Sequence, residues 1–266
     1  MKIRVCLAGV TGWAGAALAR GIVQTNDMEL VAGVSRQNAG RRLGQVLGIS
    51  ELNALVSGSV DEALRTTCDV FVEYTHPEVA KANVSTAIRR GAHVVIGTSG
   101  LSDQDLKELT QLAEQHRVGV LAVGNFSLAT VVLTKCAQLA AKYLPQWEII
   151  DYAAAEKPDA PSGTTRELAY KLAQVRRPQL AVPVEQTHGL KESRGATLHG
   201  MQVHSVRLPG YVLSAQVDFG ALDEKLSIRY DAGSSPEPYV EGALLAIRRV
   251  NSFVGLKRGL DSVMEF

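Results

Sequence analysis

The chain has 266 residues and a formal net charge of +1, with 46% hydrophobic and 21% charged residues. This composition is typical of a soluble globular protein, and the near-zero charge gives no bulk attraction to nucleic acid or to a membrane surface. No stretch approaches the roughly 18 apolar residues that a transmembrane helix needs, and no signal-peptide pattern opens the chain. We therefore expect a cytoplasmic protein of one large or two modest domains.

The cysteines and histidines argue against a disulfide-rich protein and against a metal-binding protein. The three cysteines, Cys6, Cys68 and Cys136, are odd in number and widely spaced, which argues against a disulfide framework. None of the six histidines pairs with cysteine or carboxylate residues at metal-ligand spacing. We expect no metal site.

A strand, a glycine-rich turn and a helix open the chain. Residues 2–9 are typical of a buried strand, glycines follow at positions 9, 12 and 15, and a helix is expected from about residue 14 to 24. In this context glycines let the backbone approach a pyrophosphate at the helix N-terminus. The GxxGxxG spacing alone is an ambiguous signal, because glycine turns are common between strands and helices.

The end of the second predicted strand, residues 28–34, bears on the identity of the nucleotide. It lies about 20 residues after the glycine loop, where an acidic residue would bind the ribose of NAD. Ser35 and Arg36 stand there instead, with Arg41 and Arg42 nearby. A hydroxyl and a guanidinium suit the 2′-phosphate of NADP, so NADPH is the predicted cofactor and NADH the other candidate. A solvated basic loop is the structural alternative.

The rest of the first half alternates strands and helices, with strands expected at residues 70–74, 92–97 and 118–124. Such alternation predicts a right-handed parallel sheet, whose ligands bind beyond the carboxyl ends of the strands. Small or polar residues occupy several of these ends. They are Thr75, Gly97, Thr98, Ser99, Gly124 and Asn125, with the aromatic residues Tyr74 and Phe126 beside them.

The second half has a different architecture. A helix is expected over residues 128–144, followed by a strand ending near 155, a helix over 165–175 and a long loop over 176–198. Alternating apolar and polar residues then predict antiparallel strands at 200–207, 211–218 and 225–231, before a final helix over 234–250. We predict a Rossmann-type parallel sheet with a second α+β domain built on an open mixed sheet. The domains would be 1–127 for the dinucleotide, 128–236 for substrate and oligomerisation, and 237–266 returning to the first domain.

The stretch Glu156-Lys157-Pro158-Asp159-Ala160-Pro161-Ser162-Gly163-Thr164-Thr165 joins the strand to the helix. Its two prolines hold the residues before them extended, which can fix the direction of Lys157. Ser162, Gly163 and Thr164 offer hydroxyls and free N–H groups at a helix start, where anions bind well. The pattern indicates a carboxylate-binding site, with an ordinary capped helix and a solvated lysine as the alternative.

Five motifs together resemble the 4-hydroxy-tetrahydrodipicolinate reductase family, over nearly the whole chain and in the same order. They are Gly9-Val10-Thr11-Gly12-Trp13-Ala14-Gly15, Tyr74-Thr75-His76-Pro77-Glu78, Gly97-Thr98-Ser99-Gly100, Asn125-Phe126-Ser127 and Lys157-Pro158-Asp159-Ala160-Pro161-Ser162-Gly163-Thr164. The resemblance implies a lysine-pathway reductase that uses NAD(P)H to reduce a cyclic imine-like dicarboxylate. It also implies a Rossmann domain and a second domain that builds a homotetramer.

The resemblance implies which residues meet each ligand. Lys157, Ser162, Gly163 and Thr164 would hold the small carboxylate substrate. The cofactor contacts would be Gly9, Thr11, Gly12, Trp13, Ala14, Gly15, Ser35, Arg36, Tyr74, Thr75, Gly97, Thr98, Ser99, Gly124, Asn125 and Phe126.

The sequence departs from the family pattern mainly on the substrate side. The usual histidine pair, the first of which is assigned a proton-transfer role, is replaced by Ala153 and Ala154. Trp13 replaces the usual arginine of the glycine loop, and Ser214-Ala215-Gln216 matches a Gly-Glu-His run. These changes put the lysine-pathway substrate in question.

Three functions follow from this pattern. The first is a reductase of this type in which Lys157 acts as acid or anchor. The second is a non-catalytic NADP-binding sensor or assembly protein on the same fold. The third is an amino-acid or amine dehydrogenase, with Tyr152 and Glu156 as the nearest replacement acids.

Overall fold

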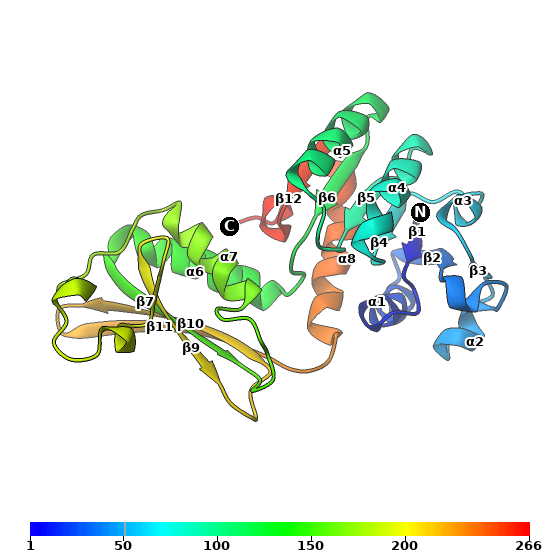
Figure 1. Cartoon of the computed structure of the whole chain (residues 1–266). Helices are drawn as coiled ribbons and strands as arrows, with labels where there is room; N and C mark the ends of the chain where they lie inside the picture. The colour runs from blue at the N-terminus through cyan, green and yellow to red at the C-terminus, as the bar shows by residue number, and fades with distance from the viewer. Residues whose placement is uncertain (51) are drawn as a thin grey trace. The chain divides into compact units, whose positions relative to one another are not determined.

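The computed structural model describes residues 1–50 and 52–266. They form two compact units, the first made of Met1–Leu128 with Pro236–Phe266 and the second of Ala129–Ser235. Figure 1 shows the path of the chain through both. Within the described residues, no helix combines the length and the apolar character that crossing a membrane would require.

The first unit is built on a seven-stranded parallel sheet. Its middle strands are almost continuously apolar, as Val5 to Ala8 are, because helices cover both faces of such a sheet. The arrangement confirms the predicted Rossmann-type fold. The order is β12-β6-β5-β4-β1-β2-β3, with β1 (Ile3–Ala8), β2 (Met28–Val34), β3 (Val56–Ser57), β4 (Val70–Glu73), β5 (His93–Ile96), β6 (Gly119–Ala122) and β12 (Gly255–Arg258).

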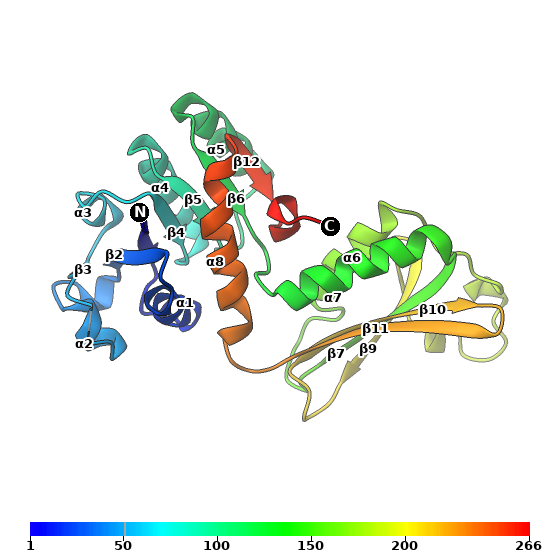
Figure 2. The same ribbon diagram turned by 180° about the vertical axis from the view of Figure 1, so that it is seen from behind.

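Helices lie on both faces of this sheet, as the two opposite views show (Figures 1 and 2). Helices α1 (Trp13–Gln24) and α8 (Val240–Arg249) pack together on one face. Gly21 permits their close approach, because a Cβ there would lie 2.3 Å from Val240 Cγ1. The other helices of the unit are α2 (Leu43–Leu47), α3 (Val60–Ala63), α4 (Pro77–Arg89) and α5 (Asp103–His116), and α4 and α5 pack together on the opposite face.

The second unit is a five-stranded mixed sheet in the order β11-β10-β7-β9-β8, which confirms the predicted open mixed sheet. Only β7 and β9 run parallel; the other neighbours are antiparallel. The strands are β7 (Gln146–Ala153), β8 (Ala196–Leu198), β9 (Met201–Arg207), β10 (Leu213–Ala221) and β11 (Glu224–Ala232).

Helices α6 (Leu128–Tyr143) and α7 (Gly163–Ala173) cover one face of the mixed sheet (Figure 2). Leu133 and Leu168 from these helices pack against Ile149, Val217 and other inward residues of the strands. On the opposite face Ile150, Tyr152 and Gln216 remain half-exposed. The mixed sheet therefore has one covered and one open face among the described residues.

Several short elements differ from the sequence-based expectation. The predicted loop 176–198 contains β8 and two 3-10 turns, Val184–Gln186 and Lys191–Arg194. Strands β3 and β12 and helix α2 were not predicted, because two to five residues are too few to show a periodicity. The predicted final helix begins only at Val240, after a 3-10 turn over Glu237–Tyr239 that contains Pro238.

Candidate active site

The glycine loop joins β1 to α1 and is shaped by its own backbone. Gly9 has a φ of +77°, and a Cβ there would lie 2.2 Å from the Tyr74 carbonyl oxygen. A Cβ on Gly15 would lie 2.1 Å from the Gly9 oxygen, so only glycine fits at both positions. Gly12 is exposed, and a Cβ there would meet only the Gly9 oxygen at 3.2 Å. The backbone at Gly12 is therefore open to close approach by a ligand.

The first turn of α1 can receive an anion. The amides of Trp13 and Ala14 have no acceptor within the described residues, as expected at a helix start. Trp13 is 61% exposed, and its ring and that of Tyr239 form a T-shaped pair with 5.9 Å between ring centroids. A pyrophosphate bound here would meet N–H groups and the helix dipole, without a charged side chain from the loop. These features fit a dinucleotide.

A chain of polar contacts links the glycine loop to the end of β2. The Thr11 and Ser35 hydroxyls lie 2.9 Å apart, and Asn38 donates to the Ser35 hydroxyl at 3.4 Å. Arg41 donates to the Asn38 side chain at 3.0 Å. Arg36 is exposed and forms no ion pair with any described residue. Its guanidinium is thus available to a phosphate.

The predicted cofactor residues after β4, β5 and β6 come together around Gly97. A Cβ on Gly97 would lie 2.1 Å from Tyr74 Cε1 and 2.8 Å from Phe126 Cε2. The Tyr74 and Phe126 rings meet edge to face, with centroids 5.6 Å apart. Gly97 is therefore required by the aromatic packing at this edge. The Tyr74 hydroxyl is buried without a hydrogen-bond partner among the described residues, and burial raises its pKa.

The remaining residues predicted at these strand ends are placed as follows. Ser99 and Gly124 are exposed, and Asn125 accepts a hydrogen bond from the Ser127 amide at 2.9 Å. Thr75 and Thr98 both donate to Glu73, the last residue of β4. Burial raises the pKa of Glu73, against the opposing effect of donors from Thr75, Asn83 and Thr98.

The loop after β7 is fixed by Asp151, a fully buried carboxylate on that strand. It accepts the Ser162 amide at 2.9 Å and the Ser162 and Thr165 hydroxyls at 2.6 and 2.8 Å. Arg207 of β9 forms an ion pair with it at 2.7 Å and also donates to the Asp159 carbonyl at 2.7 Å. Burial would raise the pKa of Asp151, but hydrogen bonds from Ser162 and Arg207 outweigh it and hold the pKa below its ordinary value.

This network decides which groups of the loop can meet a ligand. The Ser162 hydroxyl is used by Asp151 and caps α7 by accepting the Thr165 amide at 3.3 Å. The amides of Gly163 and Thr164 have no acceptor within the described residues. The free donors at this helix start are therefore main-chain groups next to Ser162, and not the Ser162 side chain.

The candidate proton donors occupy three different settings. Lys157 forms an ion pair with Asp159 at 2.8 Å, and this pair lowers the pKa of Asp159. Glu156 is exposed. Tyr152 lies on the open face of the sheet, opposite to Asp151, where it stacks on Tyr211 with 5.1 Å between centroids. Of the three, only Lys157 is held within the anchored loop by an ion pair.

The two alanines at the end of β7 differ in burial. Ala153 is fully buried on the same strand face as Asp151, and Ala154 is half-buried. The Ala154 carbonyl accepts the Lys157 amide at 3.1 Å, which closes the turn into the loop. Neither side chain can carry a proton.

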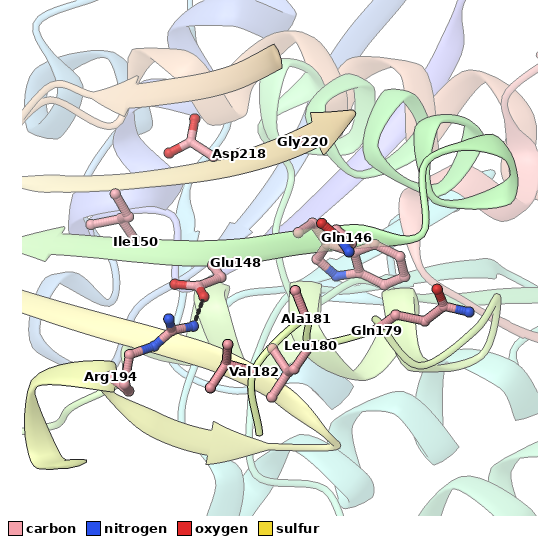
Figure 3. A pocket seen from close by; sticks show the side chains of 11 residues that line it. Gln146, Glu148, Ile150, Gln179, Leu180, Ala181, Val182, Arg194, Asp218 and Gly220 are labelled. Atoms are coloured by element: carbon pink, nitrogen blue, oxygen red, sulfur yellow. Dashed lines mark hydrogen bonds and ion pairs between the residues drawn. The ribbon is translucent and has the colours of Figure 1, made fainter. Parts of the chain in front are cut away.

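A cavity of about 400 Å³ lies on the open face of the second unit (Figure 3). Figure 3 shows Glu148 paired with Arg194, with Leu180 and Val182 of the long loop beside them. Its lining includes Gln146, Ile150 and Asp218 and none of the predicted site residues. We therefore do not assign the candidate active site to this cavity.

Sequence reasoning missed Asp151, Arg207 and Glu73. Asp151 occupies an inward position of β7, in line with the buried Trp147 and Ile149. A charged residue at such a position must find partners, and this was the available signal. Arg207 offered no comparable signal, because its partner is 56 residues away in the sequence.

Comparisons with known proteins cover nearly the whole chain. Models described as "Dihydrodipicolinate reductase, N-terminus" and "Dihydrodipicolinate reductase, C-terminus" match residues 3–126 and 129–263. A 4-hydroxy-tetrahydrodipicolinate reductase of Moorella thermoacetica is 37% identical, covering 99% of this chain and 98% of the relative. One of Desulfitobacterium hafniense is 35% identical, with 99% of each chain covered.

Two solved structures are similar to this chain over nearly its whole length. A dipicolinate-bound dihydrodipicolinate reductase from Paenisporosarcina sp. TG-14 superposes with a TM-score of 0.87 and 30% identity, covering 99% of this chain and 100% of that one. An amine dehydrogenase from Mycobacterium smegmatis has a TM-score of 0.69 at 14% identity, covering 100% of this chain and 97% of that one. The second likeness shows a shared fold alone.

The Asp151 network predicts a large cost for its removal. We expect Asp151→Asn to lower the free energy of unfolding by about 3–5 kcal/mol, because Arg207, whose side chain is 16% exposed, would be left as an uncompensated and largely buried charge. Urea denaturation at pH 7 measures this change. The matched control is Asp231→Asn, whose carboxylate is 59% exposed beside Arg229 and should contribute less than about 1 kcal/mol.

The same network predicts a pH dependence. Since the pKa of Asp151 is lowered in the folded protein, its contribution is complete above about pH 4, the ordinary aspartate pKa. It is lost as the pH falls through the lower folded value. The difference between wild type and Asp151→Asn should therefore shrink only in acid; a difference that shrinks above pH 5 would contradict this account.

Proposed function

The chain belongs to the dihydrodipicolinate reductase family, a family of NAD(P)H-dependent oxidoreductases, and from this premise we propose a specific reaction. The enzyme transfers a hydride from NADPH to a small carboxylate substrate that carries an imine-like C=N bond. The observation that carries the proposal is the Asp151-anchored loop, which presents the Lys157 ammonium and the free amides of Gly163 and Thr164. A protein that only senses the dinucleotide would not need this second group of anion-binding donors.

The first unit supplies the groups for the dinucleotide. NADPH, when bound, supplies the hydride. The open backbone at Gly12 and the free amides of Trp13 and Ala14 hold the pyrophosphate. Ser35 and Arg36 hold the 2′-phosphate, and Thr11 fixes the Ser35 hydroxyl.

The second unit supplies the groups for the substrate. The amides of Gly163 and Thr164 bind a carboxylate at the start of α7. Lys157 donates a proton to the nitrogen of the reduced bond, and its ion pair with Asp159 directs the ammonium. Ala153 and Ala154 cannot take part in proton transfer, so Lys157 carries this role.

A substrate panel tests the proposal against its alternatives. NADPH oxidation is followed by its absorbance with cyclic imine dicarboxylates, the lysine-pathway imine included, and with keto acids plus ammonia. We expect turnover with a cyclic imine. Turnover with keto acids and ammonia alone would indicate an amino-acid or amine dehydrogenase. Tight NADPH binding without any turnover would favour a sensor or assembly protein.

Arg36 should select NADPH over NADH. We expect Arg36→Ala to raise the KM for NADPH by about one to two orders of magnitude, because a charge-assisted phosphate contact is lost, while the KM for NADH changes little. Steady-state kinetics with both cofactors measure the difference. Arg20→Ala, which removes an exposed arginine of α1, is the control and should change neither KM. Equal losses for both cofactors would contradict the assignment.

Lys157 should affect the chemical step. We expect Lys157→Met to lower kcat by about 10²–10⁴-fold, the usual contribution of a general acid, with kcat/KM falling in parallel. Dinucleotide affinity should stay unchanged, because the glycine loop belongs to the first unit. Lys171→Met, at a lysine that pairs with Glu167 on α7, is the control. If Lys157→Met keeps the full kcat on the true substrate, Lys157 is not the acid, and Tyr152 or Glu156 becomes the candidate. If only the KM for the substrate rises, Lys157 binds the substrate as an anchor.

The open face of the mixed sheet supports a homotetramer. Ile150, Tyr152 and Gln216 lie on it without a covering helix. We expect light scattering at micromolar concentration to give the mass of four chains, and Ile150→Arg to reduce it. Leu139→Arg, at an exposed position of α6, is the control. A monomeric mass for the wild type would refute this assembly.

A further inference from the structure

Glu73 is the last residue of β4, between β1 and β5 in the sheet of the first unit. It is fully buried and follows three apolar residues in the same strand. A charged side chain therefore stands where an apolar one is expected. A buried carboxylate costs free energy unless donors surround it, and an apolar residue would fill the same place at lower cost. The contacts of Glu73 must therefore explain why a carboxylate stands at this position.

The side chain of Glu73 binds the loop that follows its own strand. Its Oε1 atom accepts the Thr75 amide at 2.8 Å and also the Thr75 hydroxyl. Its Oε2 atom accepts the Asn83 side-chain amide of α4 at 2.9 Å. The carboxylate thus ties the turn after β4 to the helix behind it.

Glu73 also holds the loop that follows the neighbouring strand β5. The Gly97 and Thr98 amides donate to the Glu73 carbonyl at 3.0 and 3.2 Å. The Thr98 hydroxyl donates to the same carbonyl at 3.2 Å and lies 3.4 Å from Oε1. One residue therefore fixes two of the loops at the carboxyl edge of the sheet, where ligands of such sheets bind.

These contacts change the expected role of two predicted cofactor residues. The Thr75 and Thr98 hydroxyls are both directed at Glu73. Hydroxyls used in this way are not the groups that would face a ligand at the edge. What the two loops can offer to a dinucleotide is main-chain N–H and C=O groups.

We propose that Glu73 is a positioning residue for the dinucleotide, acting through Thr75 and Thr98, whose main-chain groups and not their hydroxyls contact the cofactor. This inference rests on the proposed NADPH-dependent function and names a determinant of the same site. Glu73 itself touches no substrate or cofactor in this account. Loss of the carboxylate removes the acceptor of the Thr75 amide and hydroxyl and one of the two contacts of the Thr98 hydroxyl, while the contacts with the Glu73 carbonyl remain. A carboxamide at this position keeps the acceptor.

The test measures NADPH affinity by the fluorescence of the bound cofactor, with thermal unfolding recorded in parallel. We expect Glu73→Leu to raise the Kd by about 10- to 100-fold, the scale of loss for a displaced binding group. We expect Glu73→Gln to bind within about threefold of wild type. The oxygen of the introduced carboxamide can accept from Thr75, and its NH₂ group can pair with Asn83 once the Asn83 amide turns. At saturating NADPH, kcat should change little while the KM for NADPH rises.

A double-mutant cycle separates positioning from direct contact. Thr75→Val should weaken binding, because the Thr75 hydroxyl donates to the Glu73 carboxylate. The Glu73→Leu/Thr75→Val protein should bind no more weakly than Glu73→Leu alone, because both changes break that contact. Additive losses would show that the Thr75 hydroxyl acts independently of Glu73 and would overturn the proposal. Wild-type affinity in Glu73→Leu would overturn it as well. If Glu73→Leu does not fold, wild-type affinity in Thr75→Val would overturn the proposal.

Glu62→Leu is the matched control. Glu62 also accepts a backbone amide, from Gly58 at 2.9 Å, but it lies on α3, outside the loops that follow β4 and β5. Its replacement should leave the Kd unchanged. A wild-type protein that binds neither NADPH nor NADH would refute the proposed function itself. Tight NADPH binding by wild type that is unchanged in Glu73→Leu would refute only the role of Glu73.

Discussion

The buried ion pair between Asp151 and Arg207 is the interaction on which the second unit's candidate site depends. Asp151 gathers donors from the strand β9, from the loop and from the start of α7. No single donor would compensate the burial of this charge, but together they do. Because Arg207 also holds the Asp159 carbonyl, the position of Lys157 follows from the position of one carboxylate.

Glu73 has a corresponding place in the first unit. Both carboxylates are fully buried, both lie at or near the carboxyl end of a strand, and both accept hydrogen bonds from the loop that follows it. In each case the site loop is fixed by a charge that the proposed ligands do not touch. The rigid sheet thus determines where flexible loop residues stand, which is the usual requirement for a precise site.

Ala153 and Ala154, at the end of β7, contribute backbone contacts but no titratable side chain. Ala153 stays paired with Leu213 across the sheet, and the Lys157 amide still closes on the Ala154 carbonyl. The end of β7 therefore holds the turn into the loop through backbone contacts alone. In the proposed reaction the proton therefore comes from the loop, where Lys157 forms an ion pair with Asp159.

The sequence alone determined the Rossmann-type sheet, the open mixed sheet and the family, because apolar periodicity, glycine spacing and the Lys157 to Thr164 motif are local signals. It also marked Ser162, Thr75 and Thr98 as site residues. Only the tertiary structure decided that their hydroxyls serve buried carboxylates. It alone joined Asp151 to Arg207 across 56 residues of sequence. The physical reason is that a buried charge selects its donors by spatial proximity, and strand pairing, which no local pattern records, sets that proximity.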